Sequence, residues 1–221
     1  MNLTRTDFDD RIELTAGNPQ YAMIWLHGLG AGADDFVPVF AWLSQQLGIR
    51  MKGIFPQAPD RAVTINGGMS MPCWYDIVAA RPERVINGEH LLRSAARVQQ
   101  LADGLIREGI AADRIVIAGF SQGGAVALQS ALTFRQPLAG LICLSTYLAQ
   151  PLALAHENSG LPVFFAHGRH DGVVPMALGS RSVEALNALG LKPEWHEFAM
   201  DHEVIAEEMA AIGQFLSQVF A

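Results

Sequence analysis

The chain has 221 residues, of which 50% are hydrophobic and 17% are charged, a composition that excludes a disordered or coiled-coil protein and suffices for a full hydrophobic core. Its net charge of −7 argues against a nucleic-acid partner, because such binding requires a basic surface, and against attraction to anionic lipids. Residues 115–156 carry Arg135 as their only formal charge, yet Ser121, Gln122 and Pro137 interrupt the segment, so it does not predict a membrane-spanning helix.

Apolar segments of strand length alternate along the chain with segments of helical periodicity. Strands are expected at residues 21–27, 52–56, 114–119, 138–144, 162–166 and 194–198. Helices are expected at residues 36–47, 89–108, 122–134, 175–189 and 203–220, and the segment 58–88, rich in proline and glycine, is expected to be a loop. This alternation predicts an α/β fold with a mostly parallel sheet covered by helices on both faces. Because no repeat or linker divides the chain, we expect one domain over residues 1–221.

The strand at 114–119 leads into a motif that is typical of nucleophilic serines. Gly119-Phe120-Ser121-Gln122-Gly123 contains the pattern G-x-S-x-G, in which a tight strand-to-helix turn lifts the serine hydroxyl above the sheet. Small residues two positions before and after the serine prevent backbone clashes in that turn. The alternative interpretation is an ordinary glycine-rich turn between a strand and a helix.

A serine hydroxyl is a weak nucleophile that requires a base and an acid to orient the base. In this type of fold the chain order is serine, acid, histidine. Asp171 follows the strand at 162–166 and His202 follows the strand at 194–198, so we expect both beside Ser121 at the carboxyl ends of the strands. His196 and His170 are interpreted as structural residues.

The segment His27-Gly28-Leu29-Gly30 follows the first buried strand. Acyl transfer requires two backbone N–H donors for the oxyanion, and we expect them from Leu29 and Gln122. The same loop also satisfies the dinucleotide pattern G-x-G-x-x-A. That alternative is disfavoured because no Asp or Glu lies between residues 35 and 60. A metal site at residues 167–171 lacks a further ligand cluster, and we expect neither a metal nor a cofactor.

Taken together, the motifs resemble those of the α/β-hydrolase carboxylesterase/phospholipase family, which includes acyl-protein thioesterases and bacterial carboxylesterases. The matching segments are W-L-H-G-L-G (25–30), F-P-Q-A-P (55–59), V-T-I-N-G-G-M-S-M-P-C-W-Y-D-I (63–77), A-G-F-S-Q-G-G-A (118–125), L-S-T-Y (144–147), H-G-R-H-D-G-V-V-P (167–175) and M-D-H-E-V (200–204). The resemblance implies an α/β-hydrolase fold and the same roles for Ser121, Asp171, His202, Leu29 and Gln122.

Two residues, Asp201 and Cys73, differ from the family pattern, whereas the segment 63–77 matches it. Asp201 stands where the family usually has glycine, and Cys73 where it commonly has serine; Cys73 is interpreted as a small structural residue. The resemblance places the segment 63–77 beside the active site, so Met69, Met71 and Trp74 are expected to line an acyl groove. The alternative is that these side chains only pack the loop against the sheet.

We therefore expect a serine hydrolase that cleaves carboxylic esters with short to medium acyl chains through an acyl-enzyme. An acyl-protein thioesterase or lysophospholipase is the alternative enzyme, and a catalytically silent ligand-binding hydrolase fold is the alternative from another class. The expected partner is a small-molecule ester or acyl substrate, without nucleic acid or integral membrane association, and the sequence is compatible with a homodimer. Residues 1–10 lack a signal pattern, and Cys73 and Cys143 do not suggest a disulfide framework, so we expect a cytoplasmic protein.

Overall fold

A single large sheet organises the chain in a computed structural model that describes residues 2–80 and 83–220. Eight strands lie in the order β1 (Leu3–Phe8), β2 (Arg11–Ala16), β4 (Met51–Pro56), β3 (Tyr21–Leu26), β9 (Ile115–Phe120), β10 (Gly140–Leu144), β11 (Val163–Gly168) and β12 (Glu194–Phe198). Every neighbouring pair from β4 to β12 is parallel, whereas β2 is antiparallel to both of its neighbours. The predicted mostly parallel sheet is confirmed.

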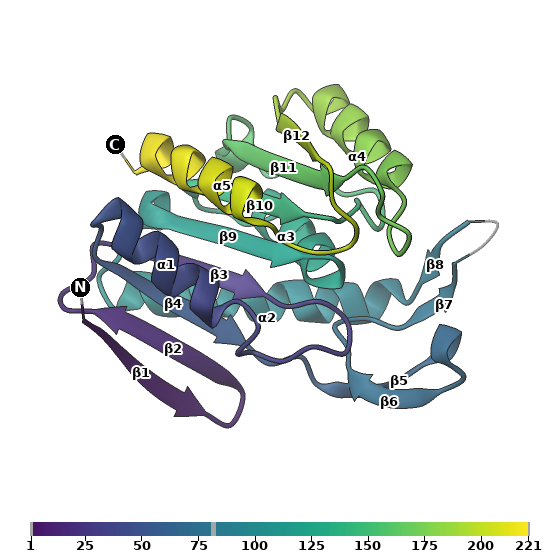
Figure 1. Cartoon of the computed structure of the whole chain (residues 1–221), viewed down its shortest axis with the longest axis horizontal. Coiled ribbons are helices and arrows are strands. Elements are labelled where there is room, and N and C mark those ends of the chain that lie inside the picture. Colours follow the sequence, from purple (N-terminus) through teal and green to yellow (C-terminus); the bar gives the residue numbers. More distant parts are fainter. Residues whose placement is uncertain (1, 81–82, 221) are drawn as a thin grey trace.

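Helices cover both faces of this sheet, as predicted (Figure 1). On one face lie α1 (Val37–Leu47) and α5 (Ala206–Val219), which contact each other. On the other face lie α2 (Gly88–Arg107), α3 (Gln122–Leu132) and α4 (Met176–Ala188). Successive residues of β3 alternate between the two cores: Ile24 and Leu26 pack below α2 and α3, and Met23 and Trp25 pack towards α1. A strand that is buried on both faces must be apolar throughout, which explains its unbroken apolar sequence.

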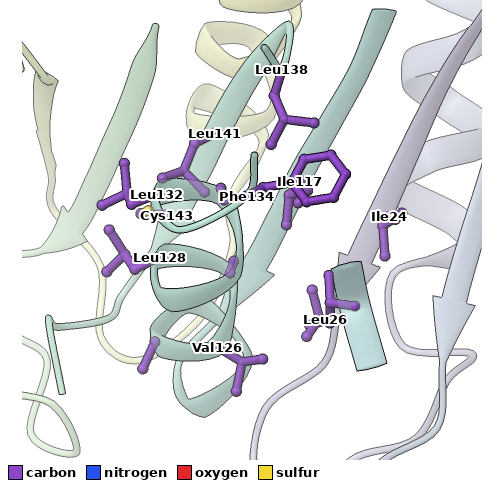
Figure 2. Packing of buried hydrophobic residues seen from close by; sticks show 14 of the residues in the cluster. Ile24, Leu26, Ile117, Val126, Leu128, Leu132, Phe134, Leu138, Leu141 and Cys143 are labelled. Carbon is purple, nitrogen blue, oxygen red and sulfur yellow. The ribbon is translucent and has the colours of Figure 1, made fainter. Parts of the chain in front are cut away.

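The segment poor in charge forms the centre of the molecule. Every residue of α3 is buried, and so are the residues of β10 and all but the last of β9. Figure 2 shows Leu128 and Leu132 of α3 beside Leu141 and Cys143 of β10. A charged side chain at these positions would lie in a low-dielectric core without a partner, so its absence follows from burial. Within the described part of the chain, no helix has the length and apolar character that a membrane crossing requires.

The expected strands and helices are present, with small shifts at their ends, but several short elements were not expected. The hairpin of β1 and β2 is one of them; five of the six residues of β1 are exposed, so no apolar pattern marks that strand. The segment 58–88 is also more ordered than a loop. It contains two small hairpins, β5 (Asp60–Val63) with β6 (Met69–Pro72) and β7 (Ile77–Ala79) with β8 (Val85–Ile86). Single turns of 3-10 helix lie at Thr64–Asn66, Ala112–Arg114 and His156–Asn158.

A buried carboxyl group in α5 makes the stability of the fold depend on pH. Glu208 is 0% exposed, and neither of its carboxylate oxygens has a hydrogen-bond partner among the described residues. Burial raises the pKa of Glu208 to about 8. Because the same group has a pKa near 4.5 in the unfolded chain, only the unfolded chain releases this proton easily. The free energy of unfolding is therefore highest below about pH 4.5, where Glu208 is protonated in both states. It decreases as the pH rises from about 4.5 to about 8.

We predict that Glu208→Gln increases the free energy of unfolding at pH 8 by several kcal/mol, since each unit of pKa shift corresponds to about 1.4 kcal/mol. The gain should shrink as the pH falls and vanish well below pH 4.5, where Glu208 is protonated in both the folded and the unfolded chain. Urea denaturation at a series of pH values measures it. Glu207→Gln, at the exposed neighbouring position, is the matched control. A gain that does not change with pH would contradict the prediction.

Candidate active site

The turn between β9 and α3 holds Ser121 in a strained backbone conformation. Its φ of 55° and ψ of −121° are uncommon for a residue with a side chain. Two glycines make the turn possible. A Cβ atom on Gly119 would lie 2.4 Å from the carbonyl oxygen of Gly123, and a Cβ atom on Gly123 would lie 2.4 Å from that of His27. Neither position can therefore hold a larger residue, which is the physical reason for the G-x-S-x-G spacing.

The structure brings the three predicted catalytic side chains into one hydrogen-bonded chain. The distance from His202 Nε2 to Ser121 Oγ is 2.9 Å, and that from His202 Nδ1 to Asp171 Oδ2 is 2.7 Å. A carboxylate accepts but does not donate, so Nδ1 of His202 carries the hydrogen and Nε2 accepts from the serine hydroxyl. This is the arrangement in which a histidine can remove the serine proton.

A close backbone contact brings the loops of the acid and the base together. Asp171 follows β11, and His202 follows the neighbouring strand β12. A Cβ atom on Gly168 would lie only 2.3 Å from the carbonyl oxygen of Asp201. The N–H of His170 also donates to the carbonyl of Met200 at 3.1 Å. The two loops are therefore joined directly by backbone, which fixes the distance between the carboxylate and the imidazole.

Asp171 is held as a carboxylate by a full set of donors. Its Oδ1 accepts the N–H groups of Val173 and Val174 at 2.9 and 2.8 Å. Its Oδ2 lies 2.7 Å from His202 Nδ1 and 3.4 Å from Nε2 of the buried His167. Burial tends to raise the pKa of Asp171, but hydrogen bonds from His167, His202 and Val174 outweigh it and hold the pKa well below its usual range. The group therefore stays ionised at neutral pH.

The two residues expected to bind an oxyanion, Leu29 and Gln122, lie in segments next to Ser121. Gln122 is the first residue of α3, so its N–H has no partner within the helix. Leu29 lies in the loop after β3, where the N–H of Gly30 donates to the carbonyl of Pro72 at 2.8 Å. A Cβ atom on Gly28 would lie 3.5 Å from Ser121 Cβ. The loop therefore passes close to the serine.

His27 fixes the peptide unit that contains the Leu29 N–H. Its Nε2 accepts the N–H of Ala58 at 3.1 Å, so its Nδ1 carries the hydrogen and donates to the carbonyl of Gly28 at 2.7 Å. Burial lowers the pKa of His27, which favours the neutral form that this pattern requires. The carbonyl of Gly28 and the N–H of Leu29 belong to one planar peptide. Holding the oxygen therefore also holds the N–H.

The side chain of Gln122 supports the same region from the other side. Its Oε1 accepts the N–H of Trp74 at 2.7 Å, and its Nε2 donates to the carbonyl of Tyr75 at 2.7 Å. The indole N–H of Trp74 donates to the carbonyl of His27 at 2.8 Å. Trp74 therefore joins the loop after β6 to the loop after β3, and it is fully buried.

A cavity of about 330 Å³ opens above Ser121. It is lined by Gly28, Leu29, Ala31, Asp35, Ile65, Ile77, Ala80, Arg84, Phe120, Ser121, Gln122, Tyr147, Val173, Val174 and His202. The expectation for the acyl groove needs revision, because Met69, Met71 and Trp74 are not among these residues. Met69 is 64% exposed, and the sulfur of Met71 lies against Gly30. The same segment reaches the cavity through other residues.

Several lining residues were not singled out from the sequence. Asp35 and Arg84 come from loops outside the segments that resemble the family and follow no helical or strand period. Val173 and Tyr147 belong to the matching segments H-G-R-H-D-G-V-V-P and L-S-T-Y, and that membership was the available indication for both. Within residues 2–80 and 83–220, no group of three or more His, Cys, Asp or Glu side chains is arranged to hold a metal ion.

A mostly parallel sheet with helices on both faces, and a serine, a histidine and an aspartate joined at the carboxyl ends of its strands, define an α/β-hydrolase fold. The family model described as Phospholipase/Carboxylesterase matches residues 9–220. The chain therefore belongs to this family of hydrolases, whose members include esterases and thioesterases.

Individual relatives agree with this assignment. Acyl-protein thioesterase 1 of Neurospora crassa is 39% identical over 209 residues, which cover 89% of this chain and 85% of that protein. Acyl-protein thioesterase 1 of Schizosaccharomyces pombe is 36% identical over 91% of this chain and 94% of that protein. The crystal structure of Arabidopsis thaliana SOBER1 has a TM-score of 0.85 at 26% identity and covers 91% of this chain and 99% of its own. The Bacillus cereus carboxylesterase, at 18% identity and a TM-score of 0.77 over 95% of this chain and 94% of its own, shares the fold.

The strained turn predicts an unusual order of stability among variants of Ser121. Glycine adopts the observed φ without strain, whereas alanine does not, and a strained residue costs about 1–3 kcal/mol. We predict that Ser121→Gly is more stable than Ser121→Ala by about 1 kcal/mol, although glycine is usually the less stable of the two. Both variants lose the hydrogen bond to His202, so their difference isolates the strain. Thermal or urea unfolding measures it, and an alanine variant of equal or greater stability would contradict it.

Proposed function

We propose that this protein is a serine hydrolase that cleaves carboxylic esters through an acyl-enzyme intermediate. The observation that carries the proposal is the hydrogen-bonded chain of Asp171, His202 and Ser121, with distances of 2.7 and 2.9 Å, at the floor of a cavity. Few structural roles require a strained serine, a histidine and a buried carboxylate in this order. The same geometry argues against a silent hydrolase fold that only binds ligands.

In the proposed mechanism, Nε2 of His202 takes the hydroxyl proton while Ser121 Oγ attacks the carbonyl carbon. The tetrahedral intermediate collapses, and His202 returns the proton to the departing alcohol. Water then attacks the acyl-enzyme, with His202 again as the base, and releases the acid and free Ser121. Asp171 keeps the imidazole in the required tautomer and stabilises its charged form.

The oxyanion of both tetrahedral intermediates would be bound by the N–H groups of Leu29 and Gln122. Two features support this role. The first is the N-terminus of α3, where free N–H groups and the helix dipole favour negative charge. The second is the bond from His27 to Gly28, which orients the peptide of Leu29 before substrate arrives. A donor that is already oriented stabilises the transition state without reorganisation.

The cavity supports a short or medium acyl chain as the favoured substrate. Its volume of about 330 Å³ is at the lower end of the range for ligand sites, roughly 300–1,000 Å³. Ile65, Ile77 and Val174 give it apolar walls. The second candidate is hydrolysis of acyl thioesters on proteins, favoured by relatives named acyl-protein thioesterase 1. We also propose a cytoplasmic location, in keeping with the two free, buried thiols of Cys73 and Cys143.

A fluorophosphonate probe tests the nucleophile directly, because it phosphonylates an activated serine. We predict that the wild type is labelled on Ser121, and that Ser121→Ala is not labelled. Ser70→Ala, at an exposed serine, is the control and should label like the wild type. Mass spectrometry of the labelled peptide locates the adduct. Undiminished labelling of Ser121→Ala would refute the proposed nucleophile.

The substrate class is decided by matched esters and thioesters with acyl chains of two to sixteen carbons. We predict that kcat/KM is highest for esters with short to medium chains and falls for the longest chain, because the cavity above Ser121 is small and the space that adjoins it is lined by the charged Glu83, Arg84 and Arg181. A maximum for long-chain thioesters would instead establish the second candidate.

A further inference from the structure

A second cavity, of about 530 Å³, adjoins the one above Ser121. The two cavities share Ala80, Arg84 and Tyr147. The second is also lined by Glu83, Leu148, Ala149, Pro175, Leu178 and Arg181. No step of the proposed mechanism uses this space. A substrate held at Ser121 could therefore extend past Arg84 into it.

Arg84 stands at the junction of the two cavities with part of its hydrogen-bonding capacity unused. One of its terminal nitrogens, Nη2, donates to the carbonyl of Val173 at 3.2 Å. Its guanidinium carbon lies 4.6 Å from the centre of the Tyr147 ring. Its Nε is buried and has no hydrogen-bond partner among the described residues. A buried N–H group without a partner is costly, so this atom indicates an acceptor that the described residues do not provide.

The charge of the second cavity is opposite to that of the whole chain. The described residues that line it include two arginines and one glutamate, which together carry a formal charge of +1, whereas the chain carries −7. Among the described residues, neither Arg84 nor Arg181 forms an ion pair with a carboxylate. Arg181 Nε donates only to the carbonyl of Ala177 in its own helix. Both cations are therefore available to a ligand.

We propose that the second cavity binds a carboxylate group of the substrate, and that Arg84 is the residue that determines this specificity. The inference rests on the proposed function, since Ser121 attacks the ester or thioester of the same molecule. A guanidinium binds carboxylates through parallel N–H donors. The formal charge of +1 suits a monoanion, and Glu83 would repel a second negative charge. Asp35 lines the first cavity but is not among the residues that line the second, and its negative charge would disfavour a substrate carboxylate in the first cavity.

Arg84 also has a structural contact, which the experiment must separate from a role in specificity. Val173, whose carbonyl accepts from Arg84, donates its own N–H to Asp171. If Arg84 only held this loop, its loss would lower the activity on every substrate equally. If it binds the carboxylate, its loss lowers activity on anionic substrates alone and acts mainly through KM, as loss of uniform binding does.

The test compares an anionic substrate with a neutral one of the same length. On the acyl side, the pair is the mono-p-nitrophenyl ester of suberic acid and that of suberamic acid. On the alcohol side, it is the butyryl ester of 6-hydroxyhexanoate and that of 6-hydroxyhexanamide. We expect the wild type to prefer the carboxylate substrate in at least one pair. Arg84→Gln should lower kcat/KM for that substrate by about tenfold or more, which is the effect of losing a hydrogen bond between charged groups. For the neutral substrate, kcat/KM of Arg84→Gln should differ from that of the wild type by less than about twofold. Arg84→Lys should keep part of the preference for the carboxylate.

Two further variants complete the design. Arg181→Gln should reduce the preference less than Arg84→Gln does, and it decides the test if Arg84→Gln does not fold. Arg93→Gln removes the same charge on the exposed side of α2 and should leave the preference unchanged. The inference is overturned if the wild type shows no preference for the carboxylate in either pair, or if Arg84→Gln lowers kcat/KM equally for the anionic and the neutral substrate. If only Arg181→Gln folds, the inference is overturned when that variant keeps the wild-type preference. Failure of the proposed function is distinct, because Ser121→Ala would then still hydrolyse the neutral esters.

Discussion

The contact of β9 with the first turn of α3 is the constraint on which the site depends. Gly119 lies against the backbone of Gly123, and Gly123 lies against the backbone of His27, so closely that neither glycine could carry a side chain. This contact forces Ser121 into a positive φ and brings the ends of β3 and β9 to one point. The strain is offset by the burial of every residue of α3, because apolar burial contributes more than such strain costs. A rigid core thus maintains a conformation that the serine alone would avoid.

Around this turn, three histidines lie at or after the ends of three parallel strands, and burial gives each a different environment. His27 is deeply buried, and its two ring nitrogens hold backbone groups on either side. His167 is also buried and directs Nε2 at both Asp171 and the carbonyl of Val174. His202 is half-buried and is the one whose ring reaches Ser121. The histidine that we propose as the base is therefore the most exposed of the three, while the other two form hydrogen bonds to the groups beside it.

Sequence patterns predicted the buried strands and helices, because burial requires apolar residues at regular positions. The inner parallel strands β3, β9, β10 and β11 are buried on both faces, so their apolar runs were visible, and the G-x-S-x-G turn located Ser121. Asp171 and His202 could be placed because each follows a strand, and parallel strands end at the same edge of a sheet. The hairpin of β1 and β2 escaped prediction because its outer strand is exposed, so that pairing rather than burial defines it.

The walls of the cavity were less predictable for a different reason. Met69 and Trp74 are apolar residues in the right segment, yet one points to solvent and the other is enclosed by Gln122 and His27. Which side of a loop faces a cavity is decided by contacts between loops, and these leave no period in the sequence. Arg84 reaches the site through such contacts, with Val173 and the Tyr147 ring.

We propose that Ser121 and His202 act as one catalytic unit. It is tested most directly by kcat/KM for p-nitrophenyl butyrate in the wild type, Ser121→Ala, His202→Ala and the double variant. Groups that act together are strongly non-additive. The account predicts that each single variant loses several orders of magnitude and that the double variant loses no more. Losses that multiply in the double variant, or a single variant that keeps the wild-type rate, would contradict it.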